Sequence, residues 1–196
     1  MAKLTLFDFD GTITSKDTLF AFARSSTSAV KYWSFMLVLL PSFVLMQLGL
    51  MSKQRGKELF LKYFFGGLEI EKFNSLCEAF CQKVLRSLLR NGAVQSIKDF
   101  QSEGARVVIV SASPENWIMP WATQMNIEVI ATKLDMVNGS ITGKINGLNC
   151  NGPEKVNRIK AFLSLDDYDE IVAFGDSKGD MPMFSLANET HFKPFR

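Results

Sequence analysis

The chain has 196 residues, of which 47% are hydrophobic and 21% charged, with 22 Lys and Arg against 20 Asp and Glu and a net charge of +2. This composition excludes a disordered, collagen-like or disulfide-stapled chain and predicts one globular unit, or a core with one insertion. One segment is unusual, because residues 32–52 contain no charged side chain and lie between Lys31 and Lys53. By length alone this run is a candidate membrane span.

The charges divide the chain into a basic segment and an acidic remainder. Residues 16–92 hold 11 Lys and Arg against 5 Asp and Glu, a net charge of +6, and the other residues carry −4. We interpret this as a basic insertion in an acidic body. Neither part has the dense basic clusters with interleaved aromatics that indicate nucleic-acid binding, so we expect no nucleic-acid partner. The basic segment is typical of an anionic membrane contact and equally of a solvated helix face.

Three cysteines and one histidine restrict the chemistry. An odd cysteine count without a secretory signal predicts a reducing, cytoplasmic location, and a first strand that begins at residue 3 leaves no room for a cleaved targeting peptide. Cys77 and Cys81 share one helix face without further zinc ligands nearby, so we expect them to be buried apolar residues. With His191 as the single histidine, the chemistry must use carboxylates, hydroxyls and lysine.

In chain order, the first half is predicted to be one strand followed by helices. Residues 3–9 form an apolar run that is typical of a buried strand. Residues 16–30, 53–65 and 69–91 have helical patterns, and Gly92 ends the last of them. Everything from about residue 16 to 92 is therefore expected to be helical.

After Gly92 strands and helices alternate. We expect helices at 93–103, 153–163 and 178–187, strands at 105–110, 127–132 and 170–174, a helix that starts with Ser113 as its cap, and a type I′ hairpin at Asn138-Gly139. This order predicts an α/β fold: a doubly wound, Rossmann-like parallel sheet with an inserted all-helical domain and a small β-hairpin. The core would comprise residues 1–15 and 93–196, and the insertion residues 16–92.

Candidate site residues follow three of the predicted strands, where the active groups of open α/β sheets gather. They are Asp8 and Asp10 after the first strand, Ser111 and Ala112 after the second, and Asp176 and Asp180 after the third, with Lys155 at the start of a helix. Each motif taken singly is more typical of a solvated turn or a helix cap. Their joint occurrence in this order favours one catalytic site.

These residue types suit phosphoryl transfer. A carboxylate such as Asp8 can attack phosphorus once a metal reduces the repulsion, and a second acid such as Asp10 can donate a proton and then activate water. Asp176 and Asp180 offer hard oxygen ligands, which predict Mg²⁺. Lys155 and Ser111 are expected to hold the phosphoryl oxygens while charge develops on them.

Four motifs resemble those of the haloacid-dehalogenase-like phosphatases: DFDGT at 8–12, VVIVS ending at Ser111, GPEK ending at Lys155 and GDSxxD at 175–180. The resemblance implies a helical cap at residues 16–92. It implies Asp8 as nucleophile, Asp10 as general acid and base, a metal site made by Asp8, Asp10, Asp176 and Asp180, and a phosphate site made by Thr12, Ser111, Ala112 and Lys155. Asp10 would bind the metal through its backbone carbonyl, Asp176 directly, and Asp180 from outside the inner coordination sphere.

The cap position is similar to that of the phosphoserine-phosphatase branch. Asp17 stands where that branch reads the amine of its substrate, although the rest of its serine-binding pattern does not appear here. The SASPE and GPEK segments and the apolar run resemble the phosphatidylglycerophosphatase-C type of lipid phosphatase. We expect a Mg²⁺-dependent phosphomonoester hydrolase that forms a phospho-aspartate on Asp8, with a small-molecule or lipid phosphate as substrate. A mutase-like phosphotransferase and a non-catalytic membrane-binding module are the alternatives.

The uncharged run is not expected to span a membrane, because a single crossing would separate Asp8 from Lys155 and Asp176. Pro41 is expected to divide it into two arms of about ten residues, in a helical hairpin or a kinked helix. These arms would be buried against residues 53–91 or against a second subunit of a homodimer. Alternatively, the apolar tip of 32–52 would contact the inner membrane face, with flanking cations around it: Arg24, Lys31, Lys53, Arg55 and Lys57.

Overall fold

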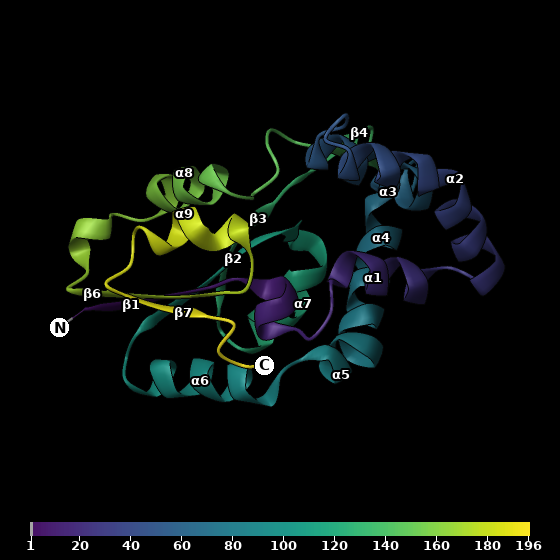
Figure 1. The fold of residues 1–196 in the computed structure, drawn as a ribbon. Helices are drawn as coiled ribbons and strands as arrows, with labels where there is room; N and C mark the ends of the chain where they lie inside the picture. The colour runs from purple at the N-terminus through teal and green to yellow at the C-terminus, as the bar shows by residue number, and fades with distance from the viewer. Residues whose placement is uncertain (1) are drawn as a thin grey trace.

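A five-stranded sheet forms the centre of the molecule in the computed structural model, which describes residues 2–196 (Figure 1). The strand order is β3-β2-β1-β6-β7, and every neighbouring pair is parallel. The strands are β1 (Lys3–Phe7), β2 (Arg106–Pro114), β3 (Glu128–Thr132), β6 (Glu170–Gly175) and β7 (Glu189–Phe192). The predicted α/β fold with a parallel sheet is confirmed.

Both faces of the sheet are covered, which explains why its central strands read as continuous apolar runs. Alternate side chains of β1 enter different cores: Phe7 packs with α6 (Asn91–Ser102) and α7 (Glu115–Gln124), and Leu6 packs with α8 (Pro153–Phe162) and α9 (Met181–Phe184). Figure 1 shows α6 on one side of the sheet and α8 and α9 on the other. The carboxyl ends of β1, β2 and β6 therefore open at one edge.

A helical cap follows β1 and a short turn, η1 (Phe9–Ile13). It consists of α1 (Thr18–Ser26), α2 (Ala29–Gln47), α3 (Lys53–Phe65), α4 (Ile70–Phe80), a π-type turn η2 (Cys81–Leu85) and α5 (Arg86–Leu88). Its core is aromatic: the ring of Phe22 packs against Phe65, Phe73 and Phe80, and stacks on Trp117 of α7 at a centroid distance of 4.9 Å. The cap and the sheet layer therefore share one continuous core.

The predicted hairpin consists of β4 (Leu134–Val137) and β5 (Ser140–Ile145), which pair in antiparallel fashion. Asn138 and Gly139 have φ of 49° and 74°, and positive values at both positions are what a type I′ turn requires. The hairpin packs along α3, where a Cβ at Gly143 would come within 2.3 Å of the Lys62 Cα. This hairpin therefore lies with the cap, although it follows the cap by some 40 residues in the chain.

The three cysteines are free and buried, which confirms the expectation for Cys77 and Cys81. Burial raises the pKa of Cys150 to about 11 and that of Cys77 further above its usual range. Thiols with such pKa values stay protonated at neutral pH and act as small apolar side chains.

Several predicted boundaries are wrong. β2 continues to Pro114, so Ser113 belongs to the strand and does not cap a helix. The predicted helix at 178–187 is only a 3₁₀ turn, η4 (Lys178–Asp180), followed by the short α9, and a further 3₁₀ turn, η3 (Leu165–Asp167), precedes β6. β7 was not predicted, because an edge strand of sequence ETHF lacks the apolar run that marks the buried strands.

For the uncharged run the structure excludes the helical hairpin, one of the two arrangements expected around Pro41. Most of it lies in α2, one 19-residue helix that contains Pro41, and no hairpin forms within it. Pro41 removes one helical hydrogen bond, to the carbonyl of Leu37. The helix continues because Tyr32 and Leu39 before the proline are buried in the cap core and Phe43 after it packs against the same core. The expected burial of the run holds for one face only, because just 17% of its most apolar window is buried.

Candidate active site

A cavity of about 420 Å³ opens at the carboxyl ends of β1, β2 and β6, between the sheet and the cap. Of the predicted site residues, Asp8, Asp10, Asp17, Ala112, Lys155, Asp176 and Asp180 line it. Thr12 and Ser111 are buried behind its wall. The structure thus gathers in one place residues that are up to 172 positions apart in the chain.

Asp8, Lys155 and Asp180 form a buried ion network at the bottom of this cavity. Lys155 Nζ lies 2.6 Å from Asp8 Oδ1, 2.6 Å from Asp180 Oδ1 and 2.7 Å from the carbonyl oxygen of Val110. All three donor positions of the ammonium are therefore used. Because the lysine extends from the first turn of α8 to the ends of β1 and β2, its position depends on the packing of the whole sheet.

The charges of this network oppose the effect of burial. Burial alone would lower the pKa of Lys155, but the Asp8 and Asp180 carboxylates hold it above its usual range. Burial raises the pKa of Asp8 to about 7 even though Lys155 counteracts it. For Asp180 burial is the largest single effect, but the Lys155 ammonium and the hydrogen bonds from Ser177 together outweigh it, so the pKa of Asp180 is lowered. The lysine thus stays charged, and Asp8 is the carboxyl group that is more easily protonated.

Thr12 and the Ser111–Ala112 segment support the walls of the site. Thr12 Oγ1 donates a hydrogen bond to Asp8 Oδ2 at 3.2 Å. The hydroxyl of Ser111 is buried and accepts a bond from the Ser113 backbone N–H at 3.0 Å. The Ala112 carbonyl accepts bonds from Thr132 and from Lys57. In this state Ser111 stabilises the strand end and does not line the cavity.

Asp10 is held by residues that the sequence patterns did not identify. Its Oδ1 accepts hydrogen bonds from the backbone N–H and the hydroxyl of Thr18, both at 2.6 Å, and its Oδ2 accepts one from Ser113 Oγ at 2.5 Å. The indole N–H of Trp117 in turn donates to Thr18 Oγ1 at 3.0 Å. This chain of bonds fixes the orientation of the Asp10 carboxylate, which a proton donor near a reacting group requires.

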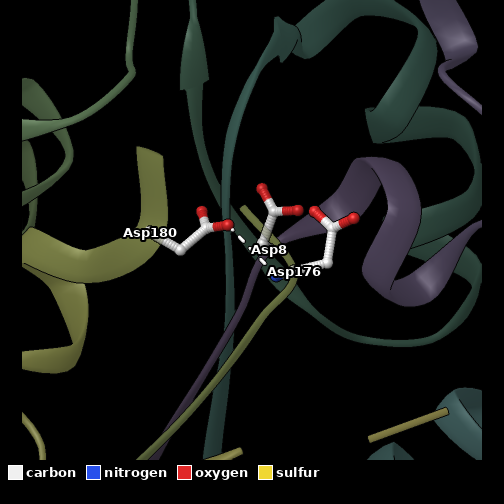
Figure 2. Close-up of side chains that lie close together, drawn as sticks. All are labelled: Asp8, Asp176 and Asp180. Carbon is white, nitrogen blue, oxygen red and sulfur yellow. Dashed lines mark hydrogen bonds between the residues drawn. The ribbon is translucent and has the colours of Figure 1, made fainter. Parts of the chain in front are cut away.

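The acidic residues also fit a divalent cation. Asp8, Asp176 and Asp180 each offer one carboxylate oxygen, and these oxygens lie within 4.8 Å of one another; Figure 2 shows the three side chains converging. Gly11, with φ of 82°, lies against Asp176, since a Cβ there would come within 2.4 Å of Asp176 Oδ2. A donor set of carboxylate oxygens matches the preference of Mg²⁺.

The three carboxylates are not equivalent as ligands. Both oxygens of Asp180 already accept hydrogen bonds, Oδ1 from Lys155 and Oδ2 from the Ser177 backbone N–H and hydroxyl at 2.9 and 2.8 Å. Within residues 2–196, Asp8 Oδ2 accepts only the 3.2 Å hydrogen bond from Thr12, and Asp176 forms an ion pair with the guanidinium of Arg196. Burial raises the pKa of Asp176, and Arg196 counteracts this. We therefore expect Asp8 and Asp176 to bind the ion directly and Asp180 to orient its surroundings.

The cap contributes Asp17 and Lys57 to the rim of the cavity. Asp17 caps α1 by accepting a hydrogen bond from the Leu19 N–H at 2.9 Å. The loss of water around its carboxylate, and then the nearby charge of Asp10, raise the pKa of Asp17 to about 6. Lys57 of α3 donates to the Ala112 carbonyl at 2.8 Å and to Asn149 Oδ1 at 3.1 Å. Its pKa is lowered because burial outweighs the nearby acids. The prediction that Lys57 flanks a membrane-facing tip is therefore wrong, because the lysine faces the cavity.

Known proteins resemble this chain over most of its length. The family model described as haloacid dehalogenase-like hydrolase matches residues 5–185. Protein CicA of Caulobacter vibrioides is 33% identical over 198 residues, which cover 98% of this chain and 86% of that protein. A phosphoserine phosphatase of Lactococcus lactis subsp. lactis is 30% identical over 102 residues, which cover 50% of this chain and 47% of that enzyme.

Solved structures share the fold. A protein of unknown function from Bordetella pertussis Tohama I superimposes with a TM-score of 0.84 at 22% identity, over 97% of this chain and 89% of its own. A phosphoserine phosphatase solved as an analogue of its phospho-aspartyl intermediate gives a TM-score of 0.69 at 20% identity, over 96% of this chain and 85% of its own. At these identities the likeness concerns the fold alone.

Proposed function

The chain belongs to the haloacid dehalogenase-like hydrolase family, and on this basis we propose that it is a Mg²⁺-dependent phosphomonoester hydrolase with Asp8 as nucleophile. The observation that carries the proposal is the position of Asp8. Its carboxylate stands at the bottom of the cavity, 2.6 Å from the Lys155 ammonium and beside the firmly held Asp10. A carboxylate placed next to a cation and an oriented second acid is what nucleophilic attack on a phosphate monoester requires.

In the first step an oxygen of Asp8 attacks phosphorus and the bond from phosphorus to the ester oxygen breaks. The electron pair of that bond leaves with the alcohol oxygen, which takes a proton from the Asp10 carboxyl group. In the second step a water molecule attacks the phosphorus and gives its proton to Asp10. The bond from phosphorus to the Asp8 oxygen breaks, which releases inorganic phosphate and restores the Asp8 carboxylate. Lys155 stabilises the negative charge on the phosphoryl oxygens throughout. Asp8 and Asp176 would hold a Mg²⁺ ion, which when bound would supply further charge neutralisation.

Chelation of the metal is expected to abolish turnover. Without the cation, the carboxylates of Asp8, Asp176 and Asp180 face an anionic substrate and repel it. Initial rates of p-nitrophenyl phosphate hydrolysis should fall to background in excess EDTA and return when Mg²⁺ is added in excess of the chelator. EDTA already saturated with Mg²⁺ is the control and should leave the rate unchanged. Full activity in free EDTA would contradict the role of the metal.

A groove beside the cavity favours substrates with an apolar chain. It has a volume of about 220 Å³ and shares Leu19, Lys57, Ala112 and Asn151 with the catalytic cavity. Beyond these residues its walls are mainly apolar side chains from α1, α2 and α3, namely Phe20, Phe43, Met46 and Phe60. A phosphate monoester bound at Asp8 would direct its alcohol portion toward this groove, where an alkyl chain is removed from water.

Chain length should therefore change specificity. Among linear alkyl phosphates we expect kcat/KM to rise with chain length until the groove is filled, because each buried methylene contributes about 0.8 kcal/mol. The assay measures released inorganic phosphate below the critical micelle concentration of each compound. Equal kcat/KM values for short and long chains would show that the groove does not bind the alcohol portion, and would favour a small polar phosphate as substrate. Transfer of the phosphoryl group to an added sugar in place of water would indicate the phosphotransferase alternative.

A further inference from the structure

One surface of the molecule remains without a role in the chemistry described above. α2 lies at the outer edge of the cap, on the right of the view in Figure 1. Its side away from α3 presents a continuous row of exposed apolar side chains at three- and four-residue spacing, with Trp33 64% and Leu37 72% exposed. This α2 face, which continues into the turn after the helix, consists of Val30, Trp33, Leu37, Val38, Leu40, Val44, Leu45, Leu48 and Leu50.

Burial of the opposite side shows that the helix lies flat on the cap. Tyr32 and Leu39 are buried, and Phe35 packs edge-on against Phe64 of α3 at a centroid distance of 5.2 Å. By length and composition α2 is apolar enough to cross a membrane. A crossing would place α1 and α3 on opposite sides of the bilayer, yet both pack into the core of the same cap. The exposed apolar row therefore needs a partner that contacts it from one side.

The charges around the α2 face indicate what that partner is. Residues 18–57 contain five basic residues and no Asp or Glu. Lys57 turns into the cavity, whereas Arg24, Lys31, Lys53 and Arg55 are exposed near the two ends of α2. In a symmetric dimer the α2 face would meet its own copy, and these uncompensated cations would come together and repel. An anionic surface lacks this conflict, because it attracts every one of them.

We propose that the α2 face docks the protein on an anionic lipid bilayer. The apolar row enters the boundary between head groups and acyl chains, and the four exposed cations contact the lipid phosphates. The apolar groove is lined on one side by Phe43 and Met46 of the same helix, so docking places the groove, and with it the catalytic cavity, close to the membrane surface. Docking itself depends on the α2 face and not on the reaction at Asp8.

Tryptophan fluorescence gives a direct test, because Trp33 is exposed whereas Trp117 and Trp121 are buried. Titration of the purified protein with vesicles of phosphatidylcholine and phosphatidylglycerol should shift the emission to shorter wavelength, and brominated lipids should quench it. Vesicles of phosphatidylcholine alone should bind more weakly, and added salt should weaken binding to the anionic vesicles. An unchanged spectrum with anionic vesicles would overturn the proposal.

A matched pair of variants tests the location of the surface. Leu37→Glu is expected to lower the partition coefficient in vesicle co-sedimentation at least about tenfold, because an apolar contact is lost and a repelled charge is added. Phe162→Glu changes another exposed apolar residue, which lies on α8, and this variant should bind as the wild type does. Equal losses in both variants, or a stable dimer that Leu37→Glu converts to monomer, would refute membrane docking.

The reaction provides a separate readout. Both variants should hydrolyse p-nitrophenyl phosphate at the wild-type rate, since neither position lines the cavity. Vesicle binding by a protein that lacks phosphatase activity would contradict the proposed function and leave the docking surface intact. Phosphatase activity without vesicle binding would contradict the docking surface and leave the proposed function intact.

Discussion

Asp8→Asn is expected to abolish phosphatase turnover and leave the fold intact. The amide has nearly the shape of the carboxylate, so it retains the place beside Lys155 Nζ, but it is far too weak a nucleophile to form the acyl phosphate. Loss of a covalent nucleophile typically lowers kcat by on the order of 10⁴-fold or more. Initial rates with p-nitrophenyl phosphate in Mg²⁺, together with far-UV circular dichroism, measure the two parts of this prediction.

Asp166→Asn is the matched control for this variant. Asp166 is an exposed acid in η3, outside the cavity, so its replacement removes the same charge without touching the site. We expect wild-type turnover from it. Turnover of Asp8→Asn close to that of the control would show that another group attacks the phosphorus.

Lys155→Met is expected to have the second largest effect, on stability as well as on activity. The change leaves the carboxylates of Asp8 and Asp180 in a buried space without the ammonium that now lies 2.6 Å from each. Removal of one partner from a buried ion pair typically costs about 3–5 kcal/mol. The free energy of unfolding, measured by urea denaturation in EDTA so that metal binding does not contribute, should fall by an amount of this order.

Lys160→Met provides the comparison for this measurement. Lys160 lies on the same helix but is exposed, so its replacement should change the free energy of unfolding by less than about 0.5 kcal/mol. If both lysine variants unfolded at the wild-type urea concentration, the ion network would have no structural role. A stable but inactive Lys155→Met variant would show that the lysine acts in catalysis, through its contact with the phosphoryl group, and not in stability.

The residues at the bottom of the cavity were predictable from the sequence because of a property of parallel sheets. Strands that run in one direction end at one edge, so Asp8, Asp176 and Asp180 could be expected to meet before their contacts were known. Lys155 was identified by its place at a helix start, although its three hydrogen bonds depend on packing that no local pattern encodes.

The residues that orient Asp10 could not be found in the same way. Ser113 resembles a helix cap because Pro114 and Glu115 follow it, and only the continuation of β2 past Ser111 brings its hydroxyl to the carboxylate. Thr18 reaches Asp10 because α1 folds back over the end of β1. Both contacts join segments whose relative placement is set by tertiary packing. Helix and strand periodicity contain no information about that placement.

The cap shows a similar limit. Composition identified the apolar run and its flanking cations but not which side of α2 would be buried, since the run is apolar around its whole circumference. It also did not distinguish Lys57, which faces the cavity, from Lys53, which is exposed. These two lysines are four positions apart, so they lie on one side of α3. Only the packing of that helix brings Lys57, and not Lys53, to Ala112 and Asn149.

Detection of a phosphoryl group on Asp8 is the most direct test of the covalent mechanism. The enzyme is mixed with substrate and Mg²⁺, stopped in acid within the first turnover, digested and analysed by mass spectrometry. If Asp8 is the nucleophile, the peptide containing Asp8 gains the mass of one phosphoryl group. This group is lost in mild alkali as an acyl phosphate is, and Asp8→Asn shows none. A phosphorylated residue elsewhere that persists in Asp8→Asn, or turnover without any phosphorylated peptide, would contradict this role of Asp8.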